Sequence, residues 1–228
     1  MVRVPYCIKL TTRVIAVHSR CSACCYNFYV TAALRASVAA LVLALPGAIR
    51  AEFCSANPAP QQWRHEFRFF GGYSPVTATL IGVETDRRFA LVGFSYSYSC
   101  WAWSSVSLRY TAGVMPAAIL IEPSHSVYGV GVTPVGFTLD FSRRHRLDTF
   151  VEFDGGIIAS TEPIPERHPD ATGLNFLFDL GGGIRWKVGP RRAVTLGYKF
   201  LHISNAFTTS FNPGVDNNVF YVGYSFLR

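Results

Sequence analysis

The chain has 228 residues, of which half are apolar, 14% are aromatic and only 15% are charged. This composition excludes a disordered chain, which is poor in aromatic residues and rich in charge. The formal net charge of +7 does not indicate a nucleic-acid partner either, because six unopposed basic residues lie within 1–51 and the rest of the chain is nearly neutral.

Residues 1–51 have the features of an export signal that is removed from the mature protein. Arg35 precedes an apolar run of 13 residues at 36–48, and small residues follow as far as Ala51. The run is too short for a spanning helix, which needs about 20 apolar residues. The cleavage site, after Ala48 or Ala51, and the true start codon stay open. Residues 52–63 are predicted to be a periplasmic segment that precedes the folded domain, 64–228.

The cysteines divide between the leader and the mature chain. Because structural zinc needs four ligands on folded elements, no metal site is expected from the four cysteines of the leader, Cys7, Cys21, Cys24 and Cys25. Cys54 and Cys100 would reach an oxidising compartment, where a disulfide between them is one outcome and two free thiols the other. No metal ion and no organic cofactor are expected.

From residue 64 onward, short stretches of alternating character recur, and no window has a long helical period. Eight strands are predicted, near 64–73, 86–99, 103–115, 128–142, 147–159, 172–187, 192–204 and 217–227. The connections after the second, fourth and sixth strands are short (100–102, 143–146 and 188–191), and the other connections are long (74–85, 116–127, 160–171 and 205–216). This alternation is typical of an all-β, eight-stranded antiparallel transmembrane β-barrel of the bacterial outer membrane, with its short turns in the periplasm.

Side-chain parity indicates which face of each strand meets lipid. In the seventh strand the even positions are large and apolar, as in Leu196 and Phe200. The odd positions are small or polar and include one charged residue, Lys199. In a membrane barrel the apolar face contacts lipid and the other face fills the narrow lumen. Acidic residues within the strands, such as Asp154 and Asp179, should then form ion pairs in the lumen. A soluble lipocalin-like carrier is the alternative, and it would turn the apolar face inward.

Three polar residues share this outward parity near the extracellular rim. His202 and Ser204 end the apolar stripe of the seventh strand, and Asp216 begins the eighth strand beside them. A serine hydroxyl needs an adjacent base to become a nucleophile, and the base needs a third group to orient it. Asn205 could offer an amide or a backbone N–H to a developing oxyanion. The pattern predicts a serine esterase, although a pair of polar rim residues would have the same sequence.

The C-terminal region resembles the outer-membrane lipid A deacylases, the PagL-like or acyloxyacyl hydrolase family. The resemblance lies in His-Ile-Ser-Asn-Ala at 202–206, Asn-Pro-Gly-Val-Asp at 212–216 and the closing strand at 219–226. It implies a hydrolase that removes an ester-linked acyl chain from lipid A, with lipopolysaccharide of the outer leaflet as its partner. Carried over residue by residue, it makes Ser204 the nucleophile, His202 the base and Asn205 an oxyanion residue. Asp216 stands where the family has glutamate.

Two functions are therefore weighed for this outer-membrane protein. The first is a lipid A esterase with a Ser204–His202–Asp216 triad. The second is a non-catalytic barrel of the same lineage with a structural, adhesive or small-ligand role, in which Asp216 does not reach His202 or Phe207 blocks the oxyanion site. The acyl position that is cleaved and the oligomeric state stay open, a homodimer included.

Overall fold

The computed structural model describes residues 64–103, 105–144 and 146–228. The predicted leader, the 52–63 segment and Cys54 lie outside this part of the chain. The described residues form nine strands and no helix, so they include no helix that could span a membrane. The strands are β1 (His65–Ser74), β2 (Thr77–Ala78), β3 (Arg88–Trp103), β4 (Val106–Ile121), β5 (Ser126–Arg144), β6 (Leu147–Ile164), β7 (Thr172–Gly189), β8 (Arg192–Ser204) and β9 (Val215–Leu227).

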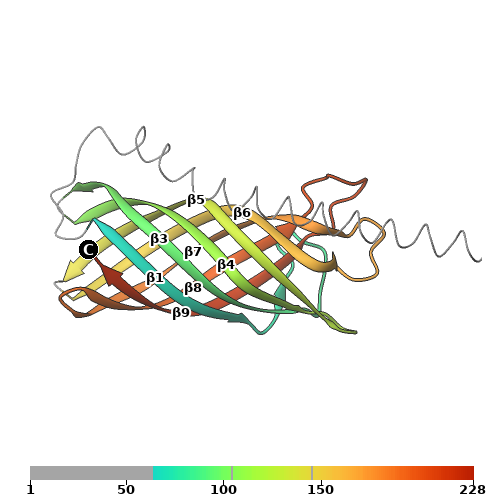
Figure 1. The fold of residues 1–228 in the computed structure, drawn as a ribbon, viewed down its shortest axis with the longest axis horizontal. Helices are drawn as coiled ribbons and strands as arrows, with labels where there is room; N and C mark the ends of the chain where they lie inside the picture. The colour runs from blue at the N-terminus through green and yellow to red at the C-terminus, as the bar shows by residue number, and fades with distance from the viewer. Residues whose placement is uncertain (1–63, 104, 145) are drawn as a thin grey trace, which may run out of the picture. The chain divides into compact units, whose positions relative to one another are not determined.

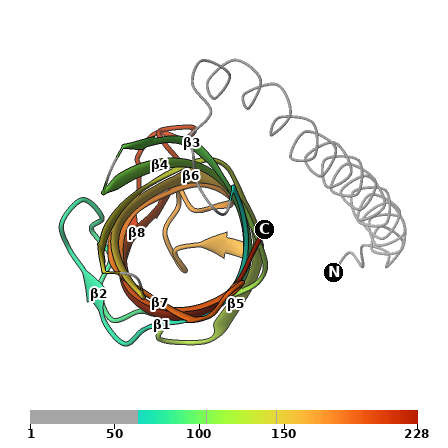
Figure 2. The ribbon, with the colours of Figure 1, turned by 90° about the vertical axis from the view of Figure 1, so that its left-hand side faces the viewer.

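Eight of these strands close a barrel. They run at a slant along its wall, as Figure 1 shows. Each long strand pairs antiparallel with its neighbour in sequence, and β1 also pairs with β9, which completes the ring seen end-on in Figure 2. The two-residue β2 pairs with the start of β9, and Figure 2 shows it outside the ring. The fold confirms the predicted eight-stranded antiparallel barrel.

The strands are longer than the sequence predicts. The expected turn at 100–102 is part of β3, and residues 116–121 and 160–164, expected in loops, extend β4 and β6. The strand end predicted at residue 115 was wrong, because β4 continues through Pro116, where its pairing with β5 shifts register between Met115 and Ala118. A bulge leaves a backbone position out of the ladder, so a proline is tolerated there.

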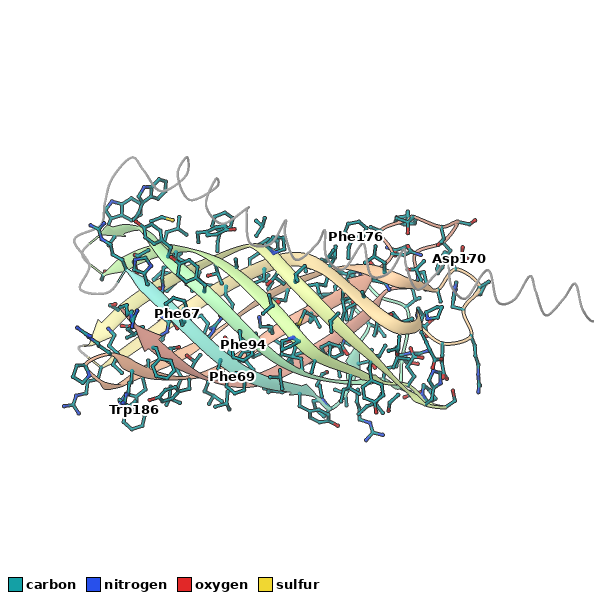
Figure 3. All side chains as sticks on the ribbon, viewed as in Figure 1. Phe67, Phe69, Phe94, Asp170, Phe176 and Trp186 are labelled. Carbon is teal, nitrogen blue, oxygen red and sulfur yellow. The ribbon has the colours of Figure 1, made fainter. Side chains whose placement is uncertain are left out.

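The apolar side chains of the last strands point outward, as parity predicts. Leu196 is 55% exposed and Phe220 is 58% exposed, whereas Ala193 and Val219 on the opposite face are fully buried. Figure 3 shows Phe67, Phe69 and Phe94 along the outer wall, and Trp186 at the end where the short turns lie. An apolar exterior excludes the lipocalin-like alternative, which needed these side chains inside.

The lumen is filled by ion pairs rather than left as a channel. The Lys199 ammonium lies 3.1 Å from an Asp179 carboxylate oxygen and 3.4 Å from oxygens of Glu152 and Asp154. Nearer the end with the short turns, Asp140 accepts hydrogen bonds from Arg109 at 2.6 Å and from Arg185 at 2.5 Å. The predicted lumenal ion pairing of Asp154 and Asp179 is confirmed. Since these two residues face the lumen, the side chains next to them along each strand face lipid.

Candidate active site on the outer face of the barrel

The predicted catalytic residues meet where β7, β8 and β9 approach the long loops. In the ladder, His202 of β8 is directly opposite Phe178 of β7 on one side and Asp216 of β9 on the other. Residues opposite one another in antiparallel strands have side chains on the same face of the sheet. The register therefore places the imidazole between an aromatic ring and a carboxylate, on the lipid-facing side.

Asp216 reaches the imidazole despite its short side chain. Its Oδ1 atom lies 2.5 Å from His202 Nδ1. The Phe178 ring lies against the other side of the imidazole, with its centroid 5.2 Å from that of the histidine ring. Since His202 and Asp216 are direct cross-strand neighbours, aspartate spans the gap without the additional methylene of glutamate. One contact thus fixes Nδ1 and leaves Nε2 as the nitrogen available to a substrate or a nucleophile.

The second carboxylate oxygen of Asp216 is held by the loop after β2. The backbone N–H groups of Leu80, Ile81 and Gly82 donate to Oδ2 at 2.8, 2.7 and 2.8 Å. The next two N–H groups of the loop, those of residues 83 and 84, donate to the Gly214 carbonyl at 3.0 and 3.4 Å. Hydrogen bonds of this kind favour the ionised carboxylate over its protonated form. We call residues 80–84, whose five successive N–H groups all point to the site, the clamp.

The clamp explains why polar residues on a lipid-facing surface are buried. His202 is 4% exposed and Asp216 has no exposed surface, although both have the parity of the exposed apolar stripe. Gly214 and Gly82 pack closely over these two side chains. A Cβ atom at Gly214 would lie 2.5 Å from His202 Cε1, and one at Gly82 would lie 2.5 Å from the Gly214 carbonyl oxygen. Glycine is therefore required at both positions if the clamp is to close over the imidazole and carboxylate.

Ser204 lies on the same face as His202, two residues along β8, opposite Phe176 of β7. Its residue is 6% exposed, whereas Phe176 beside it is 49% exposed and lies toward the loop end in Figure 3. Within the described residues, no hydrogen bond joins the Ser204 hydroxyl to the imidazole. Catalytic hydrogen bonds often close only when substrate is bound, so the missing bond does not exclude a catalytic role for Ser204.

The Asn205 side chain holds the loop that follows Ser204. Its Nδ2 atom lies within hydrogen-bonding distance of three oxygens: the Asp170 carbonyl at 3.0 Å, Thr209 Oγ1 at 2.6 Å and the Phe211 carbonyl at 2.9 Å. Its Oδ1 atom accepts from the Phe207 N–H at 2.9 Å. Since an amide has only two N–H donors, this side chain has none to spare for an oxyanion, and backbone N–H groups next to Ser204 are the better candidates.

The turn after Asn205 has an unfavourable backbone conformation. Ala206 and Phe207 have φ values of 51° and 60°, and the Thr208 N–H closes the turn on the Asn205 carbonyl at 3.1 Å. A turn with positive φ at both central residues favours glycine or asparagine. Residues held in such conformations gather at functional sites, where surrounding contacts enforce them. The Phe207 side chain is 72% exposed and does not pack into the site.

Two further features could have a chemical role: the disulfide of Cys100 and a cluster of possible metal ligands in the long loops. Cys100 is disulfide-bonded, and because Cys54 lies outside the described residues, its pairing with Cys100 stays a prediction. In the long loops, ligand-type atoms of Glu122, His125 and Glu166 lie within 4.8 Å of one another. These groups bond among themselves, with His125 Nδ1 lying 3.0 Å from Glu166, and the carboxylate of Glu122 lies 3.6 Å from the Arg87 guanidinium. A cation at this cluster would have to compete with an arginine.

Sequence reasoning located His202, Ser204 and Asp216 but missed the clamp. The residues of the clamp act through backbone N–H groups, which every residue but proline carries, so no residue type marks them. The signals that were available are Gly82 and the Asn-Pro-Gly turn that ends at Gly214. Neither glycine indicates by itself which backbone it approaches.

Comparisons with known proteins identify the family and the fold of the chain. The family model described as lipid A 3-O-deacylase (PagL) matches residues 90–225, which is more than half of the chain. The crystal structure of the outer membrane enzyme PagL is similar, with a TM-score of 0.54 and 19% identity over 68% of this chain and 97% of that chain.

Other outer-membrane proteins are less similar. Neisserial surface protein A has a TM-score of 0.46 and 9% identity over 71% of this chain and 96% of its own. Ail of Yersinia pestis, in complex with a heparin analogue, has a TM-score of 0.43 and 10% identity over 72% of this chain and 99% of its own. No curated protein sequence is similar to the chain. The chain is an outer-membrane β-barrel of Gram-negative type and belongs to the lipid A 3-O-deacylase (PagL) family.

Proposed function

We propose that the protein is a serine esterase that hydrolyses an ester-linked acyl chain of lipid A in the outer leaflet. The observation that carries the proposal is the 2.5 Å contact between His202 Nδ1 and Asp216 Oδ1 on the lipid-facing side of the barrel. A barrel needs no histidine–carboxylate pair for stability at that place, whereas acyl transfer needs one. Ser204 supplies the hydroxyl on the same strand face, and membership of a deacylase family supports the choice of substrate.

The residues divide the reaction between them. The Ser204 oxygen attacks the ester carbonyl carbon while His202 Nε2 takes its proton, and Asp216 stabilises the imidazolium that forms. The tetrahedral intermediate collapses when the alcohol oxygen of the ester leaves and takes the proton from His202, so that the acyl group remains on Ser204. Water then attacks this acyl-enzyme, His202 accepts its proton and returns it to Ser204, and the fatty acid departs. No metal or cofactor takes part in these steps.

The location of the site suits a substrate that already lies in the membrane. Phe176 and Phe178 of β7 flank Ser204 and His202 along the outer wall, and Phe176 is half exposed. An acyl chain can lie against this wall without leaving hydrocarbon, which removes the cost of extracting it through water. Lateral access of this kind explains why the catalytic groups face outward rather than into the filled lumen.

The oxyanion would be stabilised by backbone donors near Ser204. The Asn205 amide is occupied by the loop, and the Phe207 N–H donates to Asn205 Oδ1. Removal of one oxyanion donor costs about 10²–10³ in kcat in well-studied hydrolases. We expect the strained turn at Ala206 to present the donors, so its conformation contributes to catalysis rather than to barrel stability.

The test compares wild type with Ser204→Ala in outer-membrane vesicles or in bilayers that contain lipid A. The wild type should release free fatty acid, and the mass of lipid A should fall by one acyl group. Ser204→Ala should leave lipid A intact while retaining the fold. Equal acylation of lipid A with both proteins would refute the hydrolase and favour a non-catalytic barrel of the same lineage.

A further inference from the structure

The clamp is apolar on its outer surface, although its inner side bonds to polar groups. Its backbone faces Asp216 and Gly214, but its apolar side chains face away from the barrel. Leu80 is 76% exposed, Ile81 is 54% exposed and Val83 is 57% exposed. Three exposed apolar side chains on one short loop form an unusual surface for water but an ordinary surface for hydrocarbon.

This surface continues the lipid-facing wall of the barrel. The outward stripe is apolar as far as Phe200 on β8 and Phe220 on β9, and it then becomes polar at His202, Asn218 and Asp216. The clamp covers the last two of these residues, and β2, which leads into it, lies outside the ring in Figure 2. The loop thus restores an apolar exterior at the place where the strands themselves stop providing one.

The base of the loop is anchored by side-chain contacts, whereas its tip is held through its backbone. At the base, Thr77 Oγ1 donates to the Arg87 carbonyl at 2.8 Å and accepts from the Arg87 N–H at 2.7 Å. Arg87 also lies 2.8 Å from Glu84 and 3.6 Å from Glu122. At the tip, the hydrogen bonds found are the backbone bonds to Asp216 and Gly214. The side chains of Leu80 and Ile81 take no part in these bonds, so what they contact can strengthen or weaken the hold of the backbone on Asp216.

We propose that residues 80–84 are a membrane-contacting positioning segment for the catalytic carboxylate. Leu80 and Ile81 sit in the acyl layer of the outer leaflet, and this contact keeps the loop backbone against Asp216. The backbone N–H groups then hold the carboxylate in the orientation that fixes His202 Nδ1. The inference rests on the proposed function, and it adds that the triad is fully ordered only when the loop is in contact with hydrocarbon.

The mechanism has a physical basis in the hydrophobic effect. In hydrocarbon, withdrawal of the tip would expose a carboxylate and an imidazole to lipid, which is strongly unfavourable. In water, the apolar side chains of Leu80 and Ile81 would favour leaving the exposed position, and the carboxylate could be solvated instead. Contact with the membrane therefore favours the closed clamp, and loss of contact favours the open one.

The test uses the double variant Leu80→Asn and Ile81→Asn, which removes apolar side chains without touching the five backbone donors. Its matched control is Tyr128→Asn and Val130→Asn on β5, two residues that are 56% and 47% exposed and lie near the same end of the barrel. All proteins are studied in lipid nanodiscs, with retention of the folded barrel checked by heat-modifiable gel mobility. If the double variant fails to assemble, the single variants replace it.

Two measurements are made. The first is hydrogen exchange at the amides of residues 80–84, which we expect to be protected in wild type by their bonds to Asp216 and Gly214. The second is the release of acyl chains, separated into kcat and KM. In the Leu80/Ile81 variant we expect loss of amide protection and a fall in kcat of roughly 10–100-fold, since small misplacements of catalytic groups have effects of this size. The control should retain both.

Unchanged amide protection in the Leu80/Ile81 variant would overturn the proposal, as would lost protection with unchanged kcat. An equal fall in the control would also overturn it, because the effect would then be general to the membrane surface. If the wild type releases no acyl chain at all, the proposed function fails, but the exchange measurement still decides whether membrane contact holds the clamp.

Discussion

Replacing Gly214 with alanine should disable the site while leaving the barrel intact. The added Cβ atom would lie 2.5 Å from His202 Cε1 and 3.2 Å from Nε2. Carbon atoms in contact prefer a separation of about 3.5 Å or more, so the ring would have to move by about 1 Å. It cannot do so freely, because Asp216 holds one edge at 2.5 Å and Phe178 lies against its side.

A displacement of about 1 Å in a catalytic group can lower the rate by roughly 100-fold, which corresponds to about 2.7 kcal/mol of transition-state stabilisation. The backbone at Gly214 has no positive φ, so alanine introduces no strain of its own there. We therefore expect kcat for acyl release to fall about 100-fold, with little change in the urea concentration at which the barrel unfolds.

The assay is acyl release from lipid A in bilayers, measured with wild type, Gly214→Ala and the control Gly173→Ala. At Gly173 a Cβ atom would meet only the Ser160 carbonyl oxygen, at 3.6 Å, which is ordinary contact. The control should keep wild-type activity. Wild-type kcat in Gly214→Ala would show that the imidazole of His202 is not the base, because its displacement would then have no consequence.

Two further predictions concern stability. Ala206→Gly should stabilise the protein by roughly 1 kcal/mol, because it relieves the left-handed conformation at φ 51°. Ala159→Gly, at a position of β6 that pairs with both neighbouring strands, should instead destabilise the protein. Urea unfolding of both variants distinguishes the cases, and a loss of stability in Ala206→Gly would contradict the strained turn. Lys199→Met should cost about 3–5 kcal/mol at neutral pH, since it leaves the carboxylates of Glu152, Asp154 and Asp179 without their shared ammonium. The difference from wild type should shrink as the pH falls and these carboxyls take up protons, and a difference independent of pH would argue against the lumenal ion cluster.

The sequence by itself determined the parts of this protein that depend on local periodicity. Alternation with a period of two assigned Leu196 and Phe220 to the lipid-facing side, and the structure agrees. The same parity placed His202, Ser204 and Asp216 on one face, because side-chain direction along a strand follows from residue number alone. The antiparallel connection of the last two strands was enough to predict that Asp216 lies beside His202, as the register confirms.

Other features could not be inferred because they depend on contacts between distant segments. The three N–H groups that hold Asp216 lie 134–136 residues away in the chain, and no pattern in either segment encodes that meeting. Asn205 was expected to offer its amide or its backbone N–H to an oxyanion, and only the structure shows that the amide bonds to the Asp170 carbonyl, in a loop 35 residues earlier. The end of the strand was also misjudged at Pro116, where a bulge in the pairing of β4 with β5 accommodates the proline. Periodicity fixes the direction of a side chain, but only the closed barrel decides which backbone comes to cover it.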